Sequence, residues 1–586
     1  MTDLSLWGVE GRYPELPDRW GEGALFAFSG MDGPTCSESG FVATALPTPG
    51  AWLFHTPRQR VLHIAWDAPV SFGVVTGDLV LARSAGGPVG AVYPAWHSLV
   101  GWGVGEPRAA LRFSRDTGSA GDESPQVTWD PEHGDALVLC TDHNRWAAAY
   151  GSSVEEAMAR AKWALAVDLH AVLKDRLAPY RTLPAIAEPR YARLFAKCVS
   201  VMRVNTLAPE GVITSHWSTP DRVPHRHMWL WDSVFHSLGM NALDPQLGWE
   251  FLEAVLERQR ADGMIPHCMH VDGTTSAITQ PPLLAWGVWQ TYTHLGDRQR
   301  LRYALPRLES YLMWNLQHRD RNHNDLLEWH IEASPTCRSG ESGMDNSPRF
   351  DEALLLDAVD FSAFQALDML AASRIAEALG EQTRAREWRS RSAAMAARIY
   401  QSLWSAGAGI YCDRLFDGRL SRVKAVSGFS PLLLPRIPSE HVTALVQHLG
   451  NPRTFGAVFP IPSVSLDDPA WSTDMWRGAT WINYDYLVAL GLMHHGHREA
   501  AEGLIETVLR YVNTYYERYG VVFEFYDAQD KIPPPACDRK GPHREPYDIR
   551  VKMDSIRDYH WTAALVVAFL TKQLGLPWVD EDDLVA

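Results

Sequence analysis

This chain of 586 residues lacks several features, and each absence argues against a class of function. Its seven cysteines form no CxxC pair and no cluster with the spacing of zinc ligands, so we expect reduced thiols rather than a disulfide framework. The formal net charge of −16 offers no basic surface to a phosphate backbone. Nucleic acid is therefore not an expected partner.

Targeting segments and long apolar runs are missing as well. The first residues, MTDLSLWGVEGRYPEL, lack the basic and apolar regions of a signal peptide, and no stretch approaches 18 uninterrupted apolar residues. These features predict a cytoplasmic protein without membrane contact. We find no convincing GxGxxG, P-loop or HExxH pattern, so no cofactor and no bound metal are expected, and we interpret the histidines at 225–227 and 493–495 as solvated or hydrogen-bonded.

Tryptophan, by contrast, is abundant. The chain has 24 tryptophans, and aromatic residues make up 11% of it. Aromatic rings offer flat apolar faces that match sugar rings, but they also fill large helical cores. Composition leaves both interpretations open, and the positions of the rings must decide between them.

The pattern of apolar residues changes along the chain. Residues 1–150 contain short apolar runs separated by Gly and Pro turns, which predicts an all-β, sandwich-like N-terminal domain. Residues 151–185 have helical spacing and are interpreted as a helical linker. Residues 186–586 contain eleven helical segments, with room for one more near 425–433, which predicts an (α/α)6 barrel. The segments are 190–206, 228–240, 245–260, 280–296, 298–318, 360–380, 383–404, 438–448, 478–496, 498–518 and 558–575.

Two segments between the predicted helices carry carboxyl groups that suit hydrolysis of a glycosidic bond. Residues 328–351 form a loop broken by Gly, Ser and Pro, with Glu341, Asp345 and Asp351 in it. In residues 519–531, Glu524 lies inside a short apolar run. Hydrolysis needs one carboxylic acid to protonate the leaving oxygen and one carboxylate on the opposite face. From the residues alone, a cap, a turn or an ion pair is the more common role for a carboxylate in such a loop, and an exposed strand position the more common one for Glu524.

Six blocks of sequence follow one another in a recognisable order. They are MWLWDSVFHS (228–237), ESGMDNSPRFD (341–351), DFSAFQALDMLAASRIAEALG (360–380), WRGATWINYDYL (476–487), FEFYD (523–527) and YHWTAALVV (559–567). In this order they resemble glycoside hydrolase family 63, which contains α-glucosidases and the mannosylglycerate and glucosylglycerate hydrolases. Trehalases of family 37 share the ESG-x-D loop, but MDNSPR and the later blocks fit family 63 better.

The resemblance implies roles for two carboxyls. Asp345 corresponds to the general acid and Glu524 to the general base of an enzyme that inverts the anomeric centre. The two groups should then stand roughly 6.5–9.5 Å apart, with Asp345 protonated and Glu524 ionised near neutral pH. Asp527 and Asp530 lie close enough in the sequence to remain alternatives for the base.

The resemblance also implies a sugar-binding pocket. Its implied lining residues are Trp229, Trp231, Asp232, Gln280, Arg477, Trp481, Asn483 and Tyr484. Core packing is the alternative for the tryptophans, a helix cap for Asp232 and a helix start for Gln280. Gly478 would permit a close approach of the backbone there.

Other residues are expected to support the loop 328–351, which carries Asp345 and is called the acid loop below. We expect Arg338 and Arg349 to pair with Glu341 and Asp351, and Asp360 to cap the next helix. After FEFYD the chain departs from the family, because a long loop with three prolines and several basic residues, 528–557, replaces a short Gly-rich turn. This loop could reshape the leaving-group subsite.

Together these features predict an inverting, exo-acting glycoside hydrolase that releases a terminal α-linked glucose, or mannose, from a small glycoside or oligosaccharide. A small carbohydrate is thus the expected partner, and the oligomeric state stays open. Two alternatives remain, namely another (α/α)-barrel hydrolase, trehalase-like or rhamnosidase-like, and a catalytically silent carbohydrate-binding protein. A substrate panel separates the first, and measurable turnover would exclude the second.

Overall fold

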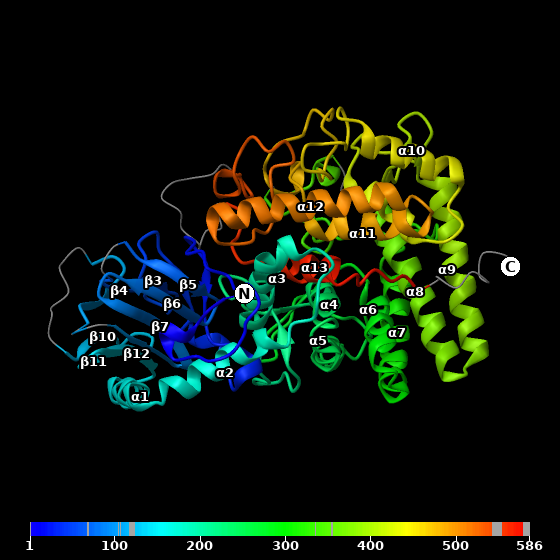
Figure 1. Ribbon diagram of the computed structural model, residues 1–586. Helices are drawn as coiled ribbons and strands as arrows, with labels where there is room; N and C mark the ends of the chain where they lie inside the picture. The colour runs from blue at the N-terminus through cyan, green and yellow to red at the C-terminus, as the bar shows by residue number, and fades with distance from the viewer. Residues whose placement is uncertain are drawn as a thin grey trace. The chain divides into compact units, whose positions relative to one another are not determined.

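The computed structural model describes residues 2–66, 69–103, 105, 107–116, 124–334, 336–352, 355–541 and 554–577. The chain divides into two compact units (Figure 1). The first unit contains Met1–Arg226, Val512–Val522 and Arg557–Ala563, and the second contains His227–Tyr511, Phe523–Ile556 and Ala564–Ala586. Each unit is described by itself below.

Two antiparallel sheets form most of the first unit. A five-stranded sheet has the order β1-β2-β3-β4-β9, and a seven-stranded sheet has the order β10-β11-β12-β8-β7-β6-β5. The predicted β-rich N-terminal region is therefore present. The strands are β1 (Leu25–Phe26), β2 (Ala43–Ala45), β3 (Ala51–Phe54), β4 (Arg60–Ile64), β5 (Ser71–Val75), β6 (Leu79–Ser84), β7 (Gly87–Ala95), β8 (Ser98–Trp102), β9 (Ala109–Phe113), β10 (Gln126–Asp130), β11 (Asp135–Asp142) and β12 (Arg145–Gly151).

The two sheets share one aromatic core. Trp52 of β3 and Trp146 of β12 come from different sheets and meet with ring centroids 6.3 Å apart. Arg60 of β4 is fully buried, and it donates to Thr56 and to the backbone carbonyl of Asp135 on β11 while it pairs with the Asp135 carboxylate. Because a buried charge is tolerated only when it is paired and hydrogen-bonded, this pair fixes how the sheets face each other.

Helices follow strand β12 in the first unit. Helix α1 (Val154–Ala166) begins at Ser153, whose hydroxyl accepts from the backbone of Glu156, and its alanines pack on β11 and β12. Helices α2 (Leu169–Arg181) and α3 (Ala192–Val204) complete this part. The predicted helical segment 151–185 thus consists of α1 and α2, and the proposed division into domains stays a prediction.

Helices dominate the remainder of the chain. Each of the eleven predicted segments contains one helix, α3 to α13, and the region 425–433 is a 3-10 helix, η6 (Val426–Leu433). The helices after α3 are α4 (Leu230–Met240), α5 (Pro245–Glu257), α6 (Leu284–Leu295), α7 (Arg298–His318), α8 (Val359–Leu379), α9 (Gln382–Ser402), α10 (Ser439–Gly450), α11 (Ile482–His494), α12 (Arg498–Tyr519) and α13 (His560–Leu570).

Short pairs of strands accompany the loops between these helices. They are β13 (Thr206–Leu207) with β14 (Trp217–Ser218), β15 (Met228–Trp229) with β16 (Cys268–Met269), β17 (Leu356–Asp357) with β20 (Arg414–Leu415), and β18 (Trp404–Ser405) with β19 (Ile410–Tyr411). The first pair belongs to the first unit and the others to the second.

The sequence explains where several helices begin and end. The first backbone N–H groups of a helix have no partner inside it. Asp244 and Asp297 accept such N–H groups at the N-termini of α5 and α7. Gly296 and Gly380 end α6 and α8 in the left-handed conformation at φ values of 65° and 85°. Local chemistry therefore sets these boundaries.

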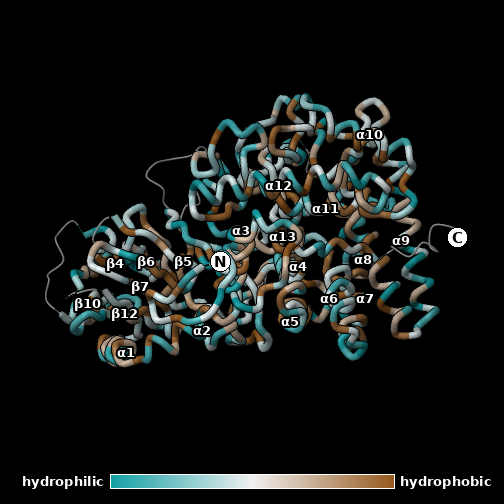
Figure 2. The backbone as a smooth tube through the Cα atoms, in the orientation of Figure 1, coloured by the Kyte–Doolittle hydropathy of each residue, from teal (hydrophilic) through white to brown (hydrophobic). Residues whose placement is uncertain are grey.

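Helices of the second unit differ in how much of their surface is buried. Most of α8 is buried, and α8 contacts α6, α7, α9 and η6. Helix α9 alternates between hydrophobic and hydrophilic residues along its length (Figure 2), as expected for a helix with one face on a core. Among the described residues, the longer helices are too polar to cross a membrane, and the apolar ones are too short.

Candidate active site

Asp345 lies in a loop that precedes α8 and that is folded back on itself. The backbone carbonyl of Asp345 accepts the N–H groups of Arg338, at 2.7 Å, and of Ser339. Gly343, two residues earlier, has φ of 70°, and a Cβ atom there would lie 2.3 Å from the ring of Trp231. Only glycine fits this turn without displacing the tryptophan, so the sequence GMD places the carboxyl of Asp345.

A buried ion-pair network lies beneath this loop, with Arg349 at its centre. Arg349 donates to both oxygens of Asp360, at 2.6 and 2.8 Å, and to both oxygens of Asp413, at 2.7 and 2.8 Å. The indole of Trp329 and the hydroxyl of Tyr484 donate to Asp360 as well. Burial alone would raise the pKa of Asp360, but Arg349 outweighs it and holds that pKa below its usual value.

These contacts correct the expected partners of the acid loop. Arg349 pairs with Asp360 and Asp413 rather than with Asp351. Asp360 accepts hydrogen bonds from Arg349, Trp329 and Tyr484. The expectation that it caps α8 is wrong, since the N-cap residue is Ala358 and no side chain caps the helix. Which carboxylate a long arginine side chain pairs with depends on the folded structure, and the spacing of the two residues along the chain does not show it.

Glu341 and Asp351 also have other partners than expected. Glu341 is fully buried and pairs with Arg319 at 2.7 Å, while its oxygens accept the N–H groups of Thr279 and His330. Asp351 pairs with Arg477 at the loop's exposed edge. Arg338 donates to the backbone carbonyls of Phe350 and Glu332, so it does hold the loop, although not through Glu341.

Glu524 lies on a fully buried segment between Phe523 and Phe525. Its backbone N–H donates to Ile556 at 2.8 Å, and the neighbouring Phe525 N–H donates to the hydroxyl of Ser555. Arg539 donates through Nε and Nη2 to the two oxygens of Glu524, both at 2.8 Å, and each side chain is 2% exposed. The carboxyl group of Glu524 is thus fixed in place by a bidentate pair with Arg539.

The carboxylate of Asp527 serves a different purpose. It accepts the backbone N–H groups of Gln529, Lys531 and Ile532, which closes the turn after the Glu524 segment. Asp527 therefore has a structural role in this turn. The carboxyl oxygens of Glu524 also accept N–H groups, from Arg539 and Ile556, so Glu524 as the base stays a prediction.

Lys540 brings Asp345 into the same region as Glu524. Its ammonium group pairs with Asp345, and Lys540 directly follows Arg539, the partner of Glu524. The structure therefore places the two predicted carboxyls beside consecutive residues of one loop. Burial alone would raise the pKa of Asp345, but Lys540, with Arg539, outweighs it and lowers that pKa. The expectation of a raised pKa at Asp345 is wrong for this geometry.

Asp474 binds the backbone of Lys540 and Gly541, and residues 539–541 are called the loop tip below. Its carboxylate accepts the backbone N–H groups of Lys540 at 2.7 Å and Gly541 at 3.0 Å. Asn346, the residue after Asp345, donates to Asp474 at 3.0 Å and accepts from the N–H of Trp476. The loop tip, the acid loop and the segment before α11 are therefore joined through one carboxylate.

His267 and Trp229 form a pair of rings, of which His267 interacts with Asp345. His267 interacts electrostatically with Asp345, and burial lowers the pKa of His267 to about 4, so its ring is neutral. Trp229, which is half-buried, meets the ring of His267 edge-to-face with centroids 5.0 Å apart. Trp229 is thus in contact with His267, and a contact of its ring with sugar stays a prediction.

The other predicted lining residues of the N-terminal half are buried. Trp231 and Asp232 are 2% and 3% exposed, and Gln280 accepts the backbone N–H of Trp231 at 3.1 Å through its side chain. Gln280 therefore holds the strand-to-helix junction that carries Trp229. A direct contact of these three residues with sugar stays a prediction.

The predicted residues around α11 are tied to the acid loop. Trp481 stacks on Trp476 at 3.8 Å, and Tyr484 donates to Asp360 beneath the loop. Asn483 is fully buried, and a Cβ atom on Gly478 would lie 2.4 Å from the carbonyl of Ser472, which confirms the expected close approach. Arg477 and these neighbours support the acid loop, and their contact with sugar stays a prediction.

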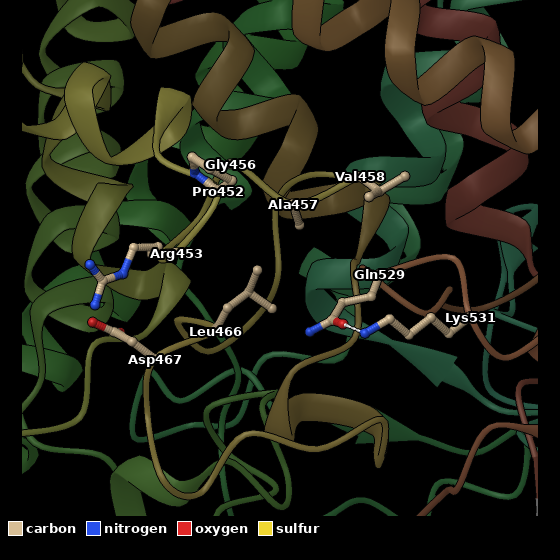
Figure 3. A pocket seen from close by; sticks show the side chains of 9 residues that line it. All are labelled: Pro452, Arg453, Gly456, Ala457, Val458, Leu466, Asp467, Gln529 and Lys531. Carbon is tan, nitrogen blue, oxygen red and sulfur yellow. Dashed lines mark hydrogen bonds between the residues drawn. The ribbon is translucent and has the colours of Figure 1, made fainter.

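A hollow of about 500 Å³ lies beside the segment that follows Glu524 (Figure 3). Gln529 and Lys531 come from that segment, and the remaining lining residues come from the loop before α11. The full lining is Pro452, Arg453, Gly456, Ala457, Val458, Leu466, Asp467, Gln529 and Lys531. Neither Asp345 nor Glu524 lines this hollow, so it is separate from the site of the two predicted carboxyls.

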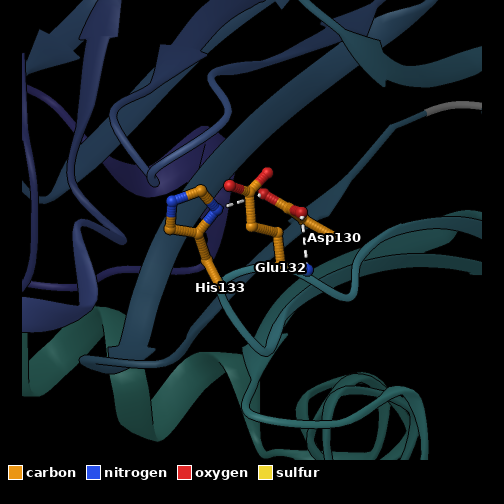
Figure 4. A group of neighbouring side chains, drawn as sticks. All are labelled: Asp130, Glu132 and His133. Carbon is orange, nitrogen blue, oxygen red and sulfur yellow. Dashed lines mark hydrogen bonds and ion pairs between the residues drawn. The ribbon is translucent and has the colours of Figure 1, made fainter.

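One group of possible metal ligands occurs among the described residues, in the first unit (Figure 4). Asp130 accepts from the ring of His133 at 2.8 Å and from the backbone N–H of Glu132 at 3.1 Å. These are the bonds of a turn between β10 and β11, and both Glu132 and His133 are exposed. The expectation that the chain binds no metal stays a prediction.

Sequence reasoning missed the partners of Asp345 and Glu524 and of other charged residues in the acid loop. Arg539 and Lys540 lie in the loop that departs from the family pattern, and the only signal was its run of basic residues. Asp413 and Arg319 carried no signal, because their partners lie 64 and 22 positions away. Part of the predicted loop, residues 542–553, lies outside the described residues.

Comparison with known proteins identifies the family. The model of the mannosylglycerate hydrolase MGH1-like glycoside hydrolase domain matches residues 225–533. A glucosylglycerate hydrolase from Mycolicibacterium hassiacum is 31% identical over 196 residues, which are 28% of this chain and 40% of that protein. The GH63 mannosylglycerate hydrolase from Thermus thermophilus, solved with glucose, is 26% identical with a TM-score of 0.52, over 64% of this chain and 99% of that one.

A bacterial glucoamylase solved with acarbose is similar in fold alone, with 10% identity and a TM-score of 0.59 over 97% of this chain and 96% of that one. The family model, in contrast, spans more than half of the 586 residues. It also contains both blocks that carry Asp345 and Glu524. The chain therefore belongs to the MGH1-like family of glycoside hydrolases, as its resemblance to family 63 implied.

Proposed function

We propose that this chain is an inverting, exo-acting hydrolase of small acidic glycosides. In this proposal it releases a terminal α-linked glucose or mannose from a substrate of the glucosylglycerate or mannosylglycerate type. The observation that carries the proposal is the pair of contacts Lys540–Asp345 and Arg539–Glu524, which gathers both carboxyls at one loop tip. The relatives named as glucosylglycerate and mannosylglycerate hydrolases supply the substrate class.

The chemistry requires one role for each carboxyl. Asp345 gives a proton to the glycosidic oxygen as the bond to the anomeric carbon breaks, and Glu524 takes a proton from the attacking water. We assign the base to Glu524 because the family resemblance marks this position and Arg539 fixes its carboxyl group, while Asp527 closes the turn that follows. In this proposal the ring of His267, which interacts with Asp345, and the ring of Trp229, which contacts His267, belong to the sugar pocket.

The same proposal includes the fold that shapes the pocket. Helices α3 to α13 are eleven, and η6 stands where the sequence left room for a twelfth segment. An (α/α)6 barrel accounts for this number, and the similarity to a GH63 enzyme supports it. Long loops at one end of such a barrel would leave room for one terminal sugar, which favours exo action.

A substrate panel tests this function. The purified protein is offered glucosylglycerate, mannosylglycerate, trehalose, maltose and a longer malto-oligosaccharide, and the released products are separated over time. We expect glucose or mannose from a glycerate glycoside, and no internal fragments from the oligosaccharide. Faster release from trehalose, early internal fragments or equal activity of the Asp345→Asn variant would contradict the proposal.

A further inference from the structure

The two cations at the loop tip differ in how they are held. Arg539 is 2% exposed and forks onto both oxygens of Glu524, so its guanidinium is fixed. Lys540 is 28% exposed, and its ammonium pairs with Asp345, which is 19% exposed. A lysine carries its charge on a flexible four-carbon stem and can change partners without moving the backbone. Lys540 is therefore the cation of this site that is able to exchange partners.

The backbone position of Lys540 is fixed even though its side chain is not. Asp474 accepts the N–H groups of Lys540 and Gly541, and Asn346 links Asp474 to the acid loop. Lys540 also has φ of 54°, a conformation that most residues avoid. The ammonium is thus always presented within reach of Asp345.

The charges around Asp345 create a conflict with its proposed role. Lys540 and Arg539 are cationic and His267 is neutral, while burial together with the Asp345 charge raises the pKa of the Cys337 thiol to about 12, so the thiol is neutral too. Burial favours the protonated carboxyl, but the ammonium of Lys540 outweighs burial and lowers the pKa of Asp345. A general acid has to be protonated before the bond breaks. Asp345 can take up that proton readily only when the Lys540 charge is neutralised by another group.

The location of Lys540 indicates which group that is. In an inverting hydrolase the acid stands at the leaving oxygen, on the aglycone side, and the base stands across the sugar ring. A cation next to the acid is therefore next to the aglycone. We propose that Lys540 binds a carboxylate on the aglycone and thereby leaves Asp345, which then takes up the proton that it donates to the leaving oxygen.

This step rests on the proposed hydrolysis and balances without any further reactant. Asp345 gains a proton from solvent when the substrate carboxylate takes the ammonium of Lys540. That proton moves to the glycosidic oxygen as the bond to the anomeric carbon breaks, and water adds its oxygen to that carbon while its proton goes to Glu524. Glu524 returns the proton to solvent, the hydroxy acid leaves, and Lys540 pairs with Asp345 again.

A matched pair of substrates tests the proposal. Glucosylglycerate and glucosylglycerol differ only in a carboxylate against a hydroxymethyl group, and the mannosyl pair is used if mannose is the sugar. We expect wild type to prefer the glycerate compound in kcat/KM by about 10–100-fold, the range of one charged hydrogen bond. Lys540→Met should lose this preference, through lower kcat/KM on the glycerate and equal or higher kcat/KM on the neutral compound.

The pH profile adds a readout that a merely structural role would not change. Without the ammonium the pKa of Asp345 in the free enzyme rises, so the alkaline limb of kcat/KM on the neutral compound should move to higher pH in Lys540→Met. Lys540→Arg should keep part of the preference. Lys531→Met, in an exposed lysine of the same loop, is the matched control and should behave as wild type.

The outcomes separate this proposal from the function that it rests on. If wild type hydrolyses neither compound of either pair, the proposed function fails and this proposal fails with it. If wild type hydrolyses the glycerate compound and Lys540→Met keeps the same preference and the same alkaline limb, this proposal alone is overturned. Product inhibition of wild type gives a test independent of folding, because glycerate should inhibit more strongly than glycerol, and equal inhibition would contradict carboxylate binding.

Discussion

Replacing Arg349 by methionine should destabilise the second unit and inactivate the site together. Arg349 and Asp360 are fully buried, and Asp413 is 3% exposed, so the change leaves two carboxylates unpaired away from water. Removing one partner of a buried ion pair costs about 3–5 kcal/mol. Asp345 precedes Arg349 by four residues in the same loop, and a displacement of about 1 Å there lowers kcat by roughly 100-fold.

Urea unfolding followed by tryptophan fluorescence, with kcat measured on the same samples, checks this prediction. Arg419→Met removes a pair in which both side chains are more than half exposed, so it should leave stability and kcat unchanged. The triple variant Arg349→Met, Asp360→Asn, Asp413→Asn should regain a large part of the lost stability, because no buried charge remains unpaired. An Arg349→Met protein within about 1 kcal/mol of wild type would refute the reasoning.

Other substitutions test the site more directly. Asp345→Asn and Glu524→Gln should each lower kcat by about 10²–10⁴-fold while the folded signal remains, and a variant that keeps more than about a tenth of wild-type kcat would not fit an acid or base role. Gly343→Ala should lower kcat and the thermal midpoint, since its Cβ would lie 2.3 Å from the Trp231 ring at φ of 70°. Gly418→Ala has a similar φ of 86° with no neighbouring atom within 4 Å, so it measures the backbone strain alone.

The helices were predictable because their signals are local. The apolar spacing of 298–318 predicted α7 to its last residue, and Asp297 supplies the cap in the adjoining sequence. Gly380 likewise ends α8 within the predicted range. These signals act over a few residues, so an isolated sequence contains all the information that they need.

The partners of the charged residues were not predictable in the same way. Arg349 finds Asp413 at a separation of 64 positions, and Glu341 finds Arg319 rather than Arg338. Such pairs form only after the helices have packed. The family resemblance located Asp345 and Glu524, but it gave no information on Arg539, which lies where this chain differs from the family.

Time-resolved proton NMR of the first product tests the central claim most directly. The enzyme is mixed with α-linked glucosylglycerate, and in parallel with the mannosyl compound, and the anomeric signals are recorded before mutarotation. The account predicts that the β-anomer of the released sugar appears first, because Glu524 directs water to the face opposite Asp345. Initial release of the α-anomer would contradict inversion, and no release from either compound would contradict the proposed function.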